Sequence, residues 1–236
     1  MLNLNSCYLL PAAIHNITVA NIGALPQFPN FTGEEAYYAG VKALDETLQP
    51  GGGHFETPRY EDVQQYYDAI SAGAQYEQLI DMLNANGQLS QAMYVQLQYL
   101  GRLINESADL EGLQNNMNIF INSSQRNTNL NGTEIITCCS IGNIGMASGY
   151  FWNNAHNDSN SPWYPYMQDD SDTSKTKKNP NLRSLKWWVK ALITVGCDIA
   201  GGAIGAAAGS LLGPAGTIAG ATVCGGGASA CATKNL

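Results

Sequence analysis

The residues that could do chemistry are few and scattered along this chain of 236 residues. The three histidines, His15, His54 and His156, have no carboxylate or cysteine at the spacing of a catalytic or metal-binding motif. Gly51 to Gly53 precede His54, but they lack the Lys-Ser/Thr pair of a phosphate-binding loop. We therefore expect this glycine run to end a helix.

The acidic residues also lack a catalytic pattern. Asp169, Asp170 and Asp172 are close enough in sequence to attract Ca²⁺, but they have neither the spacing nor the final Glu of an EF-hand loop. Glu34–Glu35 and Glu61–Asp62 suit the first turns of helices, where the helix dipole favours negative charge. The sequence predicts no catalytic residue, no metal site and no cofactor, and it favours a protein that is not an enzyme.

The six cysteines carry the remaining reactive chemistry. None forms a CxxC pair, and none has a histidine at zinc-finger spacing. Their even number, in a chain rich in Asn and poor in Lys, favours disulfides in an oxidising compartment, with buried thiols as the alternative. We therefore expect an extracellular or cell-surface location. The cysteines are Cys7, Cys138, Cys139, Cys197, Cys224 and Cys231.

Charge divides the chain into two parts. Charged residues make up 13% of the chain, about half the usual share of roughly 25%. Residues 1–174 hold 18 acidic and 4 basic side chains, whereas residues 175–236 hold 7 basic and 1 acidic. Six of the basic residues precede a long apolar run: Lys175, Lys177, Lys178, Arg183, Lys186 and Lys190. Because they flank apolar residues and follow an acidic body, we do not expect nucleic acid as a partner.

The pattern of apolar residues predicts an all-α fold in four parts. Residues 1–31 form an irregular N-terminal arm, and residues 32–155 form an acidic body of five or six short helices. Thr32 and Glu35 match a capping box, and Ser90 and Ser107 are candidate caps of later helices. The last body helix is expected from about Thr133 to Asn154.

Residues 156–182 are predicted to be a linker, because three prolines interrupt any helix there. The aromatic cluster from Trp163 to Tyr166 is unusual for a free linker. We expect it to dock on the body of the protein, with a partner chain or a lipid interface as alternatives.

The tail, residues 183–236, has no charged side chain from Ile199 to Thr233. Helices are expected over 187–212 and 217–232, joined by a turn at Gly213–Gly216. Glycines recur every four residues in the first helix and again at the start of the second, which allows close helix packing. They are Gly201, Gly205, Gly209, Gly213, Gly216 and Gly220. Cys197 and Cys231 lie equally far from Pro214, so a disulfide between them is expected to join the two arms.

Two interpretations of this hairpin remain open. Basic residues, then Trp187 and Trp188, then an uncharged segment is the order expected at a lipid interface. The segment is long enough to span a bilayer, but it consists mostly of Gly and Ala and contains Asp198. The other interpretation is a seam packed inside a protein or between copies of this chain.

The ladder from Gly201 to Gly213, with the second Gly/Ala-rich helix, resembles the glycine-zipper segments of bacteriocin-like secreted peptides. The resemblance covers residues 187–232 and implies permeabilisation of bacterial membranes. The leading expectation is thus a secreted bacterial protein whose tail acts on an anionic membrane. The alternative is a structural subunit of an extracellular filament or surface assembly, in which copies of the chain form a homo-oligomer.

Overall fold

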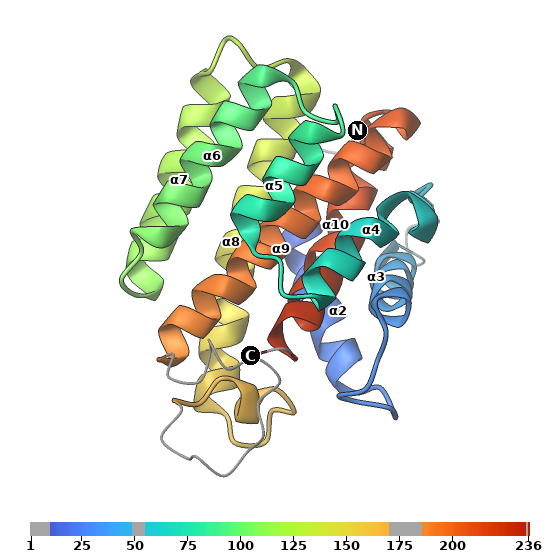
Figure 1. The fold of residues 1–236 in the computed structure, drawn as a ribbon, viewed down its shortest axis with the longest axis vertical. Helices are drawn as coiled ribbons and strands as arrows, with labels where there is room; N and C mark the ends of the chain where they lie inside the picture. The colour runs from blue at the N-terminus through green and yellow to red at the C-terminus, as the bar shows by residue number, and fades with distance from the viewer. Residues whose placement is uncertain (1–9, 49–54, 170–185, 235) are drawn as a thin grey trace.

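The structure, a computed structural model, describes residues 10–48, 55–169, 186–234 and 236. Within these residues all regular elements are helices, so the predicted all-α class is confirmed (Figure 1). The first six helices in the order of Figure 1 are α2 (Leu10–Gly23), α3 (Gly33–Leu48), α4 (Tyr60–Ser71), α5 (Tyr76–Ala85), α6 (Gln91–Asn105) and α7 (Leu110–Arg126). They are followed by α8 (Gly132–Asn157), the 3₁₀ turn η2 (Tyr164–Tyr166), α9 (Trp187–Gly209), the 3₁₀ turn η4 (Ser210–Leu212) and α10 (Gly213–Thr233).

The predicted irregular arm over residues 1–31 is wrong for residues 10–23, which form helix α2; residues 1–9 lie outside the described residues. Pro11 is tolerated because it lies in the first turn, where its missing N–H has no helical partner to lose. Ile14, Val19 and Ile22 are fully buried. Their burial outweighs the weaker helix propensity of β-branched residues.

The body helices begin largely where the sequence predicts. The amide of Glu35 donates to the hydroxyl of Thr32, and Glu35 accepts the Thr32 amide in return, which completes the capping box of α3. Ser90 caps α6 by accepting the Met93 amide. The cap predicted at Ser107 is wrong, because that side chain is buried and donates to the Leu103 carbonyl; Asp109 caps α7 instead.

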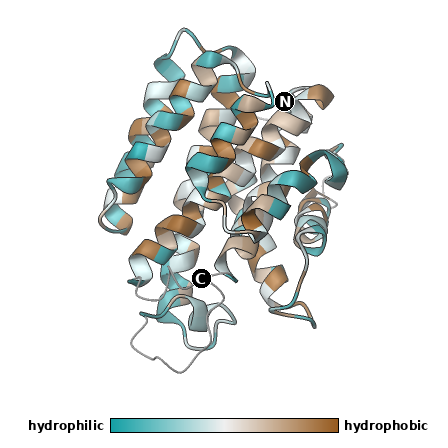
Figure 2. Cartoon of the chain, in the orientation of Figure 1, coloured by the Kyte–Doolittle hydropathy of each residue, from teal (hydrophilic) through white to brown (hydrophobic). Residues whose placement is uncertain are grey.

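The α9–α10 hairpin occupies the centre of the bundle (Figure 1). Helix α9 packs on α4, α5, α6 and α8, while α10 packs on α2, α3, α4 and α8. All residues of α10 from Gly216 to Thr233 are buried. In Figure 2 the outer helices α4 to α7 show much teal, whereas the hairpin is pale to brown along its length. The helices that pack on the hairpin, α2 to α6 and α8, therefore form a sheath around it, with polar residues on the outside and apolar residues facing the hairpin.

The aromatic cluster of the expected linker docks on its own chain. Trp163 is 1% exposed, and its indole N–H donates to the Val19 carbonyl at 3.2 Å. Its ring also packs edge-on against Trp152 of α8 and Phe28. The segment after α8 thus closes one end of the bundle over α2.

Candidate functional site

The seam between α9 and α10 is built from glycine backbone. A Cβ atom added to Gly205 would lie 2.0 Å from the carbonyl oxygen of Gly220, and one on Gly220 would lie 1.9 Å from that of Gly205. Gly209 and Gly216 face each other in the same way, with 2.1 Å and 2.6 Å to the opposite carbonyl oxygens. No side chain fits between these backbones, so glycine is required at these four positions.

The remaining ladder positions differ in role. A Cβ on Gly201 would lie 2.5 Å from both the Cys224 carbonyl oxygen and the Ala228 Cβ, so Gly201 belongs to the seam. Gly213 does not, because it lies at the turn with φ of +78° and no atom within 4 Å of an added Cβ. Its positive φ is the backbone conformation that glycine adopts without strain.

The predicted Cys197–Cys231 disulfide is wrong: Cys197 carries a free thiol, and the structure holds no disulfide between the two residues. The reason is the register of the hairpin. Gly205 faces Gly220 and Gly209 faces Gly216, so the arms are centred on the Leu212–Gly213 bond and not on Pro214. This displaces the two cysteines by about three residues, close to one helical turn.

The predicted lipid-facing residues are engaged with the protein itself. The Trp187 ring stacks on His156 with centroids 4.1 Å apart, and the Trp188 indole donates to the Ser107 carbonyl at 3.0 Å. Lys190 is 2% exposed, and its ammonium group donates to the Gln168 carbonyl at 2.7 Å. In this structure the ammonium group of Lys190 is therefore inaccessible to lipid. Lys186, the residue before α9, is exposed. The other predicted cations, Lys175, Lys177, Lys178 and Arg183, lie outside the described residues.

A buried charged pair joins the hairpin to its sheath. The imidazole Nε2 of His15 in α2 lies 2.8 Å from the Oδ2 of Asp198 in α9, and both side chains are 0% exposed. The same oxygen accepts the Ser148 hydroxyl at 2.5 Å and the Trp152 indole N–H at 3.3 Å, both from α8. The His15 Nδ1 lies 2.8 Å from the Asn16 side-chain oxygen. Three helices thus meet at a single carboxylate.

The electrostatics of this pair follow from burial and partnership. Desolvation alone lowers the pKa of His15, but the charge and hydrogen bond of Asp198 outweigh it and raise the pKa above its ordinary value of 6.5. No motif spacing connects His15 with Asp198, so this pair was not predicted from the sequence. One signal was present in the sequence, since Asp198 interrupts an apolar run and a buried carboxylate requires a partner.

The arrangement does not support acyl-transfer chemistry at this centre. In a Ser-His-Asp triad the imidazole lies between the hydroxyl and the carboxylate, whereas here the carboxylate lies between the other two. All three side chains are sealed from solvent. Among the described residues no group of three His, Cys, Asp or Glu side chains could hold a metal ion.

One surface groove lies beside the turn of the hairpin, and the described residues that line it form no cluster of reactive side chains. The groove beside the hairpin turn is lined in part by Met93, Glu134, Thr137 and Ala206. Glu134 is the one ionisable residue among the described residues that line it. Its carboxylate accepts the amide of Asn131 and the hydroxyl of Ser90, so it caps α8.

The hairpin is long and apolar enough to cross a membrane. The stretch Trp187–Thr233 covers 47 residues, and most of it is buried inside the protein. The core helices of a soluble protein have the same length and composition, so the property alone is weak evidence. The exposed apolar residues of this stretch lie at the turn, where Leu211 is 91% and Leu212 40% exposed, and at the start of α9, where Val189 is 39% exposed. A scan against protein-family models and searches of curated proteins and solved structures found no match for this chain.

Proposed function

We propose that this chain is a secreted, bacteriocin-like membrane-active protein, and that the α9–α10 hairpin inserts into an anionic bilayer after the sheath opens. The observation that carries the proposal is the placement of the most apolar segment. A hairpin long and apolar enough to span a membrane lies at the centre of the bundle, and it is mostly buried except at its turn and at the start of α9. In water the other helices cover most of the apolar hairpin and keep the protein soluble. In the proposed membrane state the hairpin is available to insert into lipid.

The cohesion of the hairpin supports this proposal. The arms touch through backbone at Gly205, Gly209, Gly216 and Gly220, and therefore need no large side chains to stay together. Small residues at helix interfaces are also how helices associate within lipid, where the hydrophobic effect between helices is absent. The contacts that hold the hairpin in water are thus of a kind that also works in a bilayer.

The charge pattern supports an anionic target. Lys175, Lys177, Lys178, Arg183 and Lys186 precede α9 in the sequence, and Lys186 is the residue directly before the helix. Basic residues beside a membrane segment contribute about 1 kcal/mol each of attraction to anionic lipid. Positive charge remains at the surface while the uncharged turn enters the bilayer.

The experiment compares the full chain with a variant whose sheath is locked. A Cβ on Gly226 of α10 would lie 3.0 Å from the Thr18 Cβ of α2. A disulfide needs about 3.5–4.5 Å between Cβ atoms, so Thr18→Cys/Gly226→Cys requires α2 and α10 to separate by about half an ångström. We expect the oxidised variant to release no dye from phosphatidylglycerol-containing vesicles, and reductant to restore release.

Two controls accompany the locked variant. The unmodified chain receives the same oxidant and reductant, and each single cysteine variant shows the effect of the substitution alone. Absence of dye release by the unmodified chain from anionic vesicles would overturn the proposal. Large ordered polymers in lipid-free buffer would instead favour the structural subunit of an extracellular assembly.

A further inference from the structure

The buried carboxylate of Asp198 is the acidic exception in an otherwise apolar hairpin. It lies in the interior of α9, and no charged residue follows it until Lys234. Its Oδ2 accepts hydrogen bonds from Ser148 and Trp152 and lies 2.8 Å from the Nε2 of His15, while its Oδ1 has no hydrogen-bond partner among the described residues. A half-satisfied carboxylate in the interior is tolerated only while its counter-charge is present.

Helix α2 holds both arms of the hairpin at this level. His15 contacts α9 through Asp198, and the carbonyl oxygen of the same residue lies 2.9 Å from a Cβ placed on Gly226 of α10. The ion pair therefore sits where one sheath helix meets the two arms together. Loss of the pair weakens the contact of α2 with the whole hairpin.

The other groups around the pair do not replace either charge. Helix α8 contributes Ser148 and Trp152, which carry none, and α2 adds the neutral Asn16. Ionisable groups near Asp198 include the thiol of Cys197 on α9, and Cys231 of α10 and Glu77 of α5 act on that thiol. Lys190 is bound to the Gln168 carbonyl, two helical turns before Asp198.

We infer that the His15–Asp198 pair is a pH-sensitive latch, which holds the α9–α10 hairpin in its sheath while His15 is charged and releases it when His15 becomes neutral. A neutral imidazole leaves the buried Asp198 carboxylate without a counter-charge. The sheath then opens because water reaches the carboxylate more readily in the open state. This inference rests on the proposed function for its biological use, but the latch itself can be tested without lipid.

The direction of the switch follows from the pKa of His15. Because Asp198 raises the folded-state pKa above 6.5, the pair contributes its full stability below that value. That contribution is lost as pH rises through the raised pKa. The latch is therefore closed in mildly acidic solution and opens on the alkaline side.

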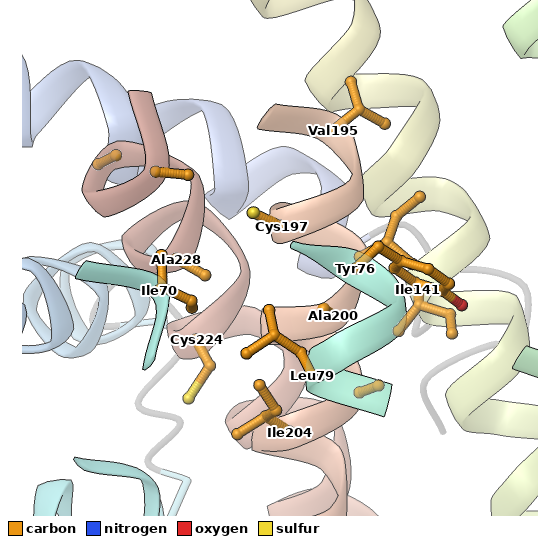
Figure 3. Close-up of a cluster of buried hydrophobic side chains, with 14 of the residues drawn as sticks. Ile70, Tyr76, Leu79, Ile141, Val195, Cys197, Ala200, Ile204, Cys224 and Ala228 are labelled. Carbon is orange, nitrogen blue, oxygen red and sulfur yellow. The ribbon is translucent and has the colours of Figure 1, made fainter. Parts of the chain in front are cut away.

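Native thiols report the opening. Figure 3 shows Cys197 and Cys224 in the two arms of the hairpin, among side chains of the sheath such as Ile70, Tyr76, Leu79 and Ile141. Cys138 lies on α8, outside the hairpin, with its sulfur against Met93 of α6, and it is also fully buried. Burial raises the pKa of both Cys224 and Cys138 to about 12, so both thiols are unreactive in the closed state.

The test measures alkylation of each cysteine by maleimide in the full chain, resolved by mass spectrometry. The readout is the rate at Cys224 divided by the rate at Cys138, which removes the shared effect of pH on thiol reactivity. We expect this ratio to rise about tenfold or more between about pH 6 and about pH 9. His15→Gln is expected to give the high ratio at both pH values.

Two further variants decide between a latch and general damage. In His15→Gln/Asp198→Asn no charge is buried at this centre, so we expect a low ratio that does not change with pH. Gln98→Ala changes an exposed side chain of α6, far from the pair in sequence and outside the hairpin, and should behave as the unmodified chain. If His15→Gln does not fold, the pH titration of the unmodified chain and the double variant still test the inference.

A flat ratio in the unmodified chain, or equal ratios in His15→Gln and the unmodified chain, would overturn the latch. A rising ratio without dye release from vesicles would keep the latch and remove the membrane function. Dye release with a ratio that does not change with pH would keep the membrane function and remove the latch. The two proposals therefore fail separately.

Discussion

Two helical hairpins in this molecule are held together in different ways. In α6–α7 the helices meet through side chains, and Gln96 donates to the hydroxyls of Ser123 and Ser124 while accepting from Asn127. In α9–α10 the arms meet through glycine backbone, at separations that exclude any Cβ. The α6–α7 pair has a solvent face, whereas α10 has none from Gly216 to Thr233.

The comparison indicates which hairpin would stay together if it separated from the other helices, as the proposed function requires. The α6–α7 pair owes its cohesion to amphipathic faces, which pack only when the apolar sides of both helices are covered. The α9–α10 pair owes its cohesion to fixed backbone complementarity, which does not depend on the sheath. Three substitutions break or sharpen this contrast.

The largest expected effect is at the glycine seam. Gly205→Ala places a methyl group 2.0 Å from the Gly220 carbonyl oxygen, and neither backbone can yield without separating the arms. We expect a loss of about 3 kcal/mol or more in the free energy of unfolding, measured by urea denaturation. Gly132→Ala is the matched control, because an added Cβ there meets no atom within 4 Å. Equal stability of the two variants would refute backbone contact at the seam.

The next effect is the pH dependence of stability at the buried pair. With its pKa raised, His15 makes the unmodified chain lose stability as pH rises above 6.5, by at most about 1.4 kcal/mol per pH unit. Asp198→Asn removes the carboxylate that raises the pKa of His15, while desolvation, which lowers this pKa, remains. The fall in stability with rising pH should therefore vanish or reverse. Urea midpoints at several pH values measure both slopes. Parallel curves for the two proteins would contradict the assignment.

The smallest effect is at the side-chain seam of α6–α7. Gln96 is 7% exposed, and Gln96→Ala removes three hydrogen bonds without leaving Ser124 unpaired, since its hydroxyl also donates to the Phe120 carbonyl. We expect a loss of about 1–2 kcal/mol in the free energy of unfolding. Gln98→Ala, at an exposed position of the same helix, should change it by less than about 0.5 kcal/mol. A loss at Gln96 as large as at Gly205 would remove the contrast between the hairpins.

The sequence was sufficient for features with a local cause. The Thr32–Glu35 capping box, the Ser90 cap and the extent of α8 each depend on residues within a few positions, and each was predicted correctly. Helix α2 was missed because Pro11, Pro26 and Pro29 made the whole arm look irregular and β-branched residues disfavour a helix locally, whereas burial of α2 against α10 and α8 favours the helix.

Features that depend on the register of two packed helices, or on residues far apart in the chain, could not be predicted from the sequence. The Cys197–Cys231 prediction needed the position of the turn to within one residue. The turn predicted at Gly213–Gly216 is wrong, because the chain turns at η4 and α10 already begins at Gly213. The His15–Asp198 pair joins residues near opposite ends of the chain, which no spacing rule connects. The central position of the hairpin follows from apolarity on all sides, which by itself fits lipid and protein interiors equally.

The central place of α9–α10 also has a consequence for how the chain acquires its structure. Ribosomes make α2 to α8 before the hairpin, so these helices emerge without the surface on which they pack. Contacts between α2 and α10 close a loop of most of the chain, and such long-range contacts slow folding. Until the last helices emerge, the nascent chain exposes apolar faces of the kind that chaperones bind. Completion of the fold therefore waits for the segment that the proposed function would later release.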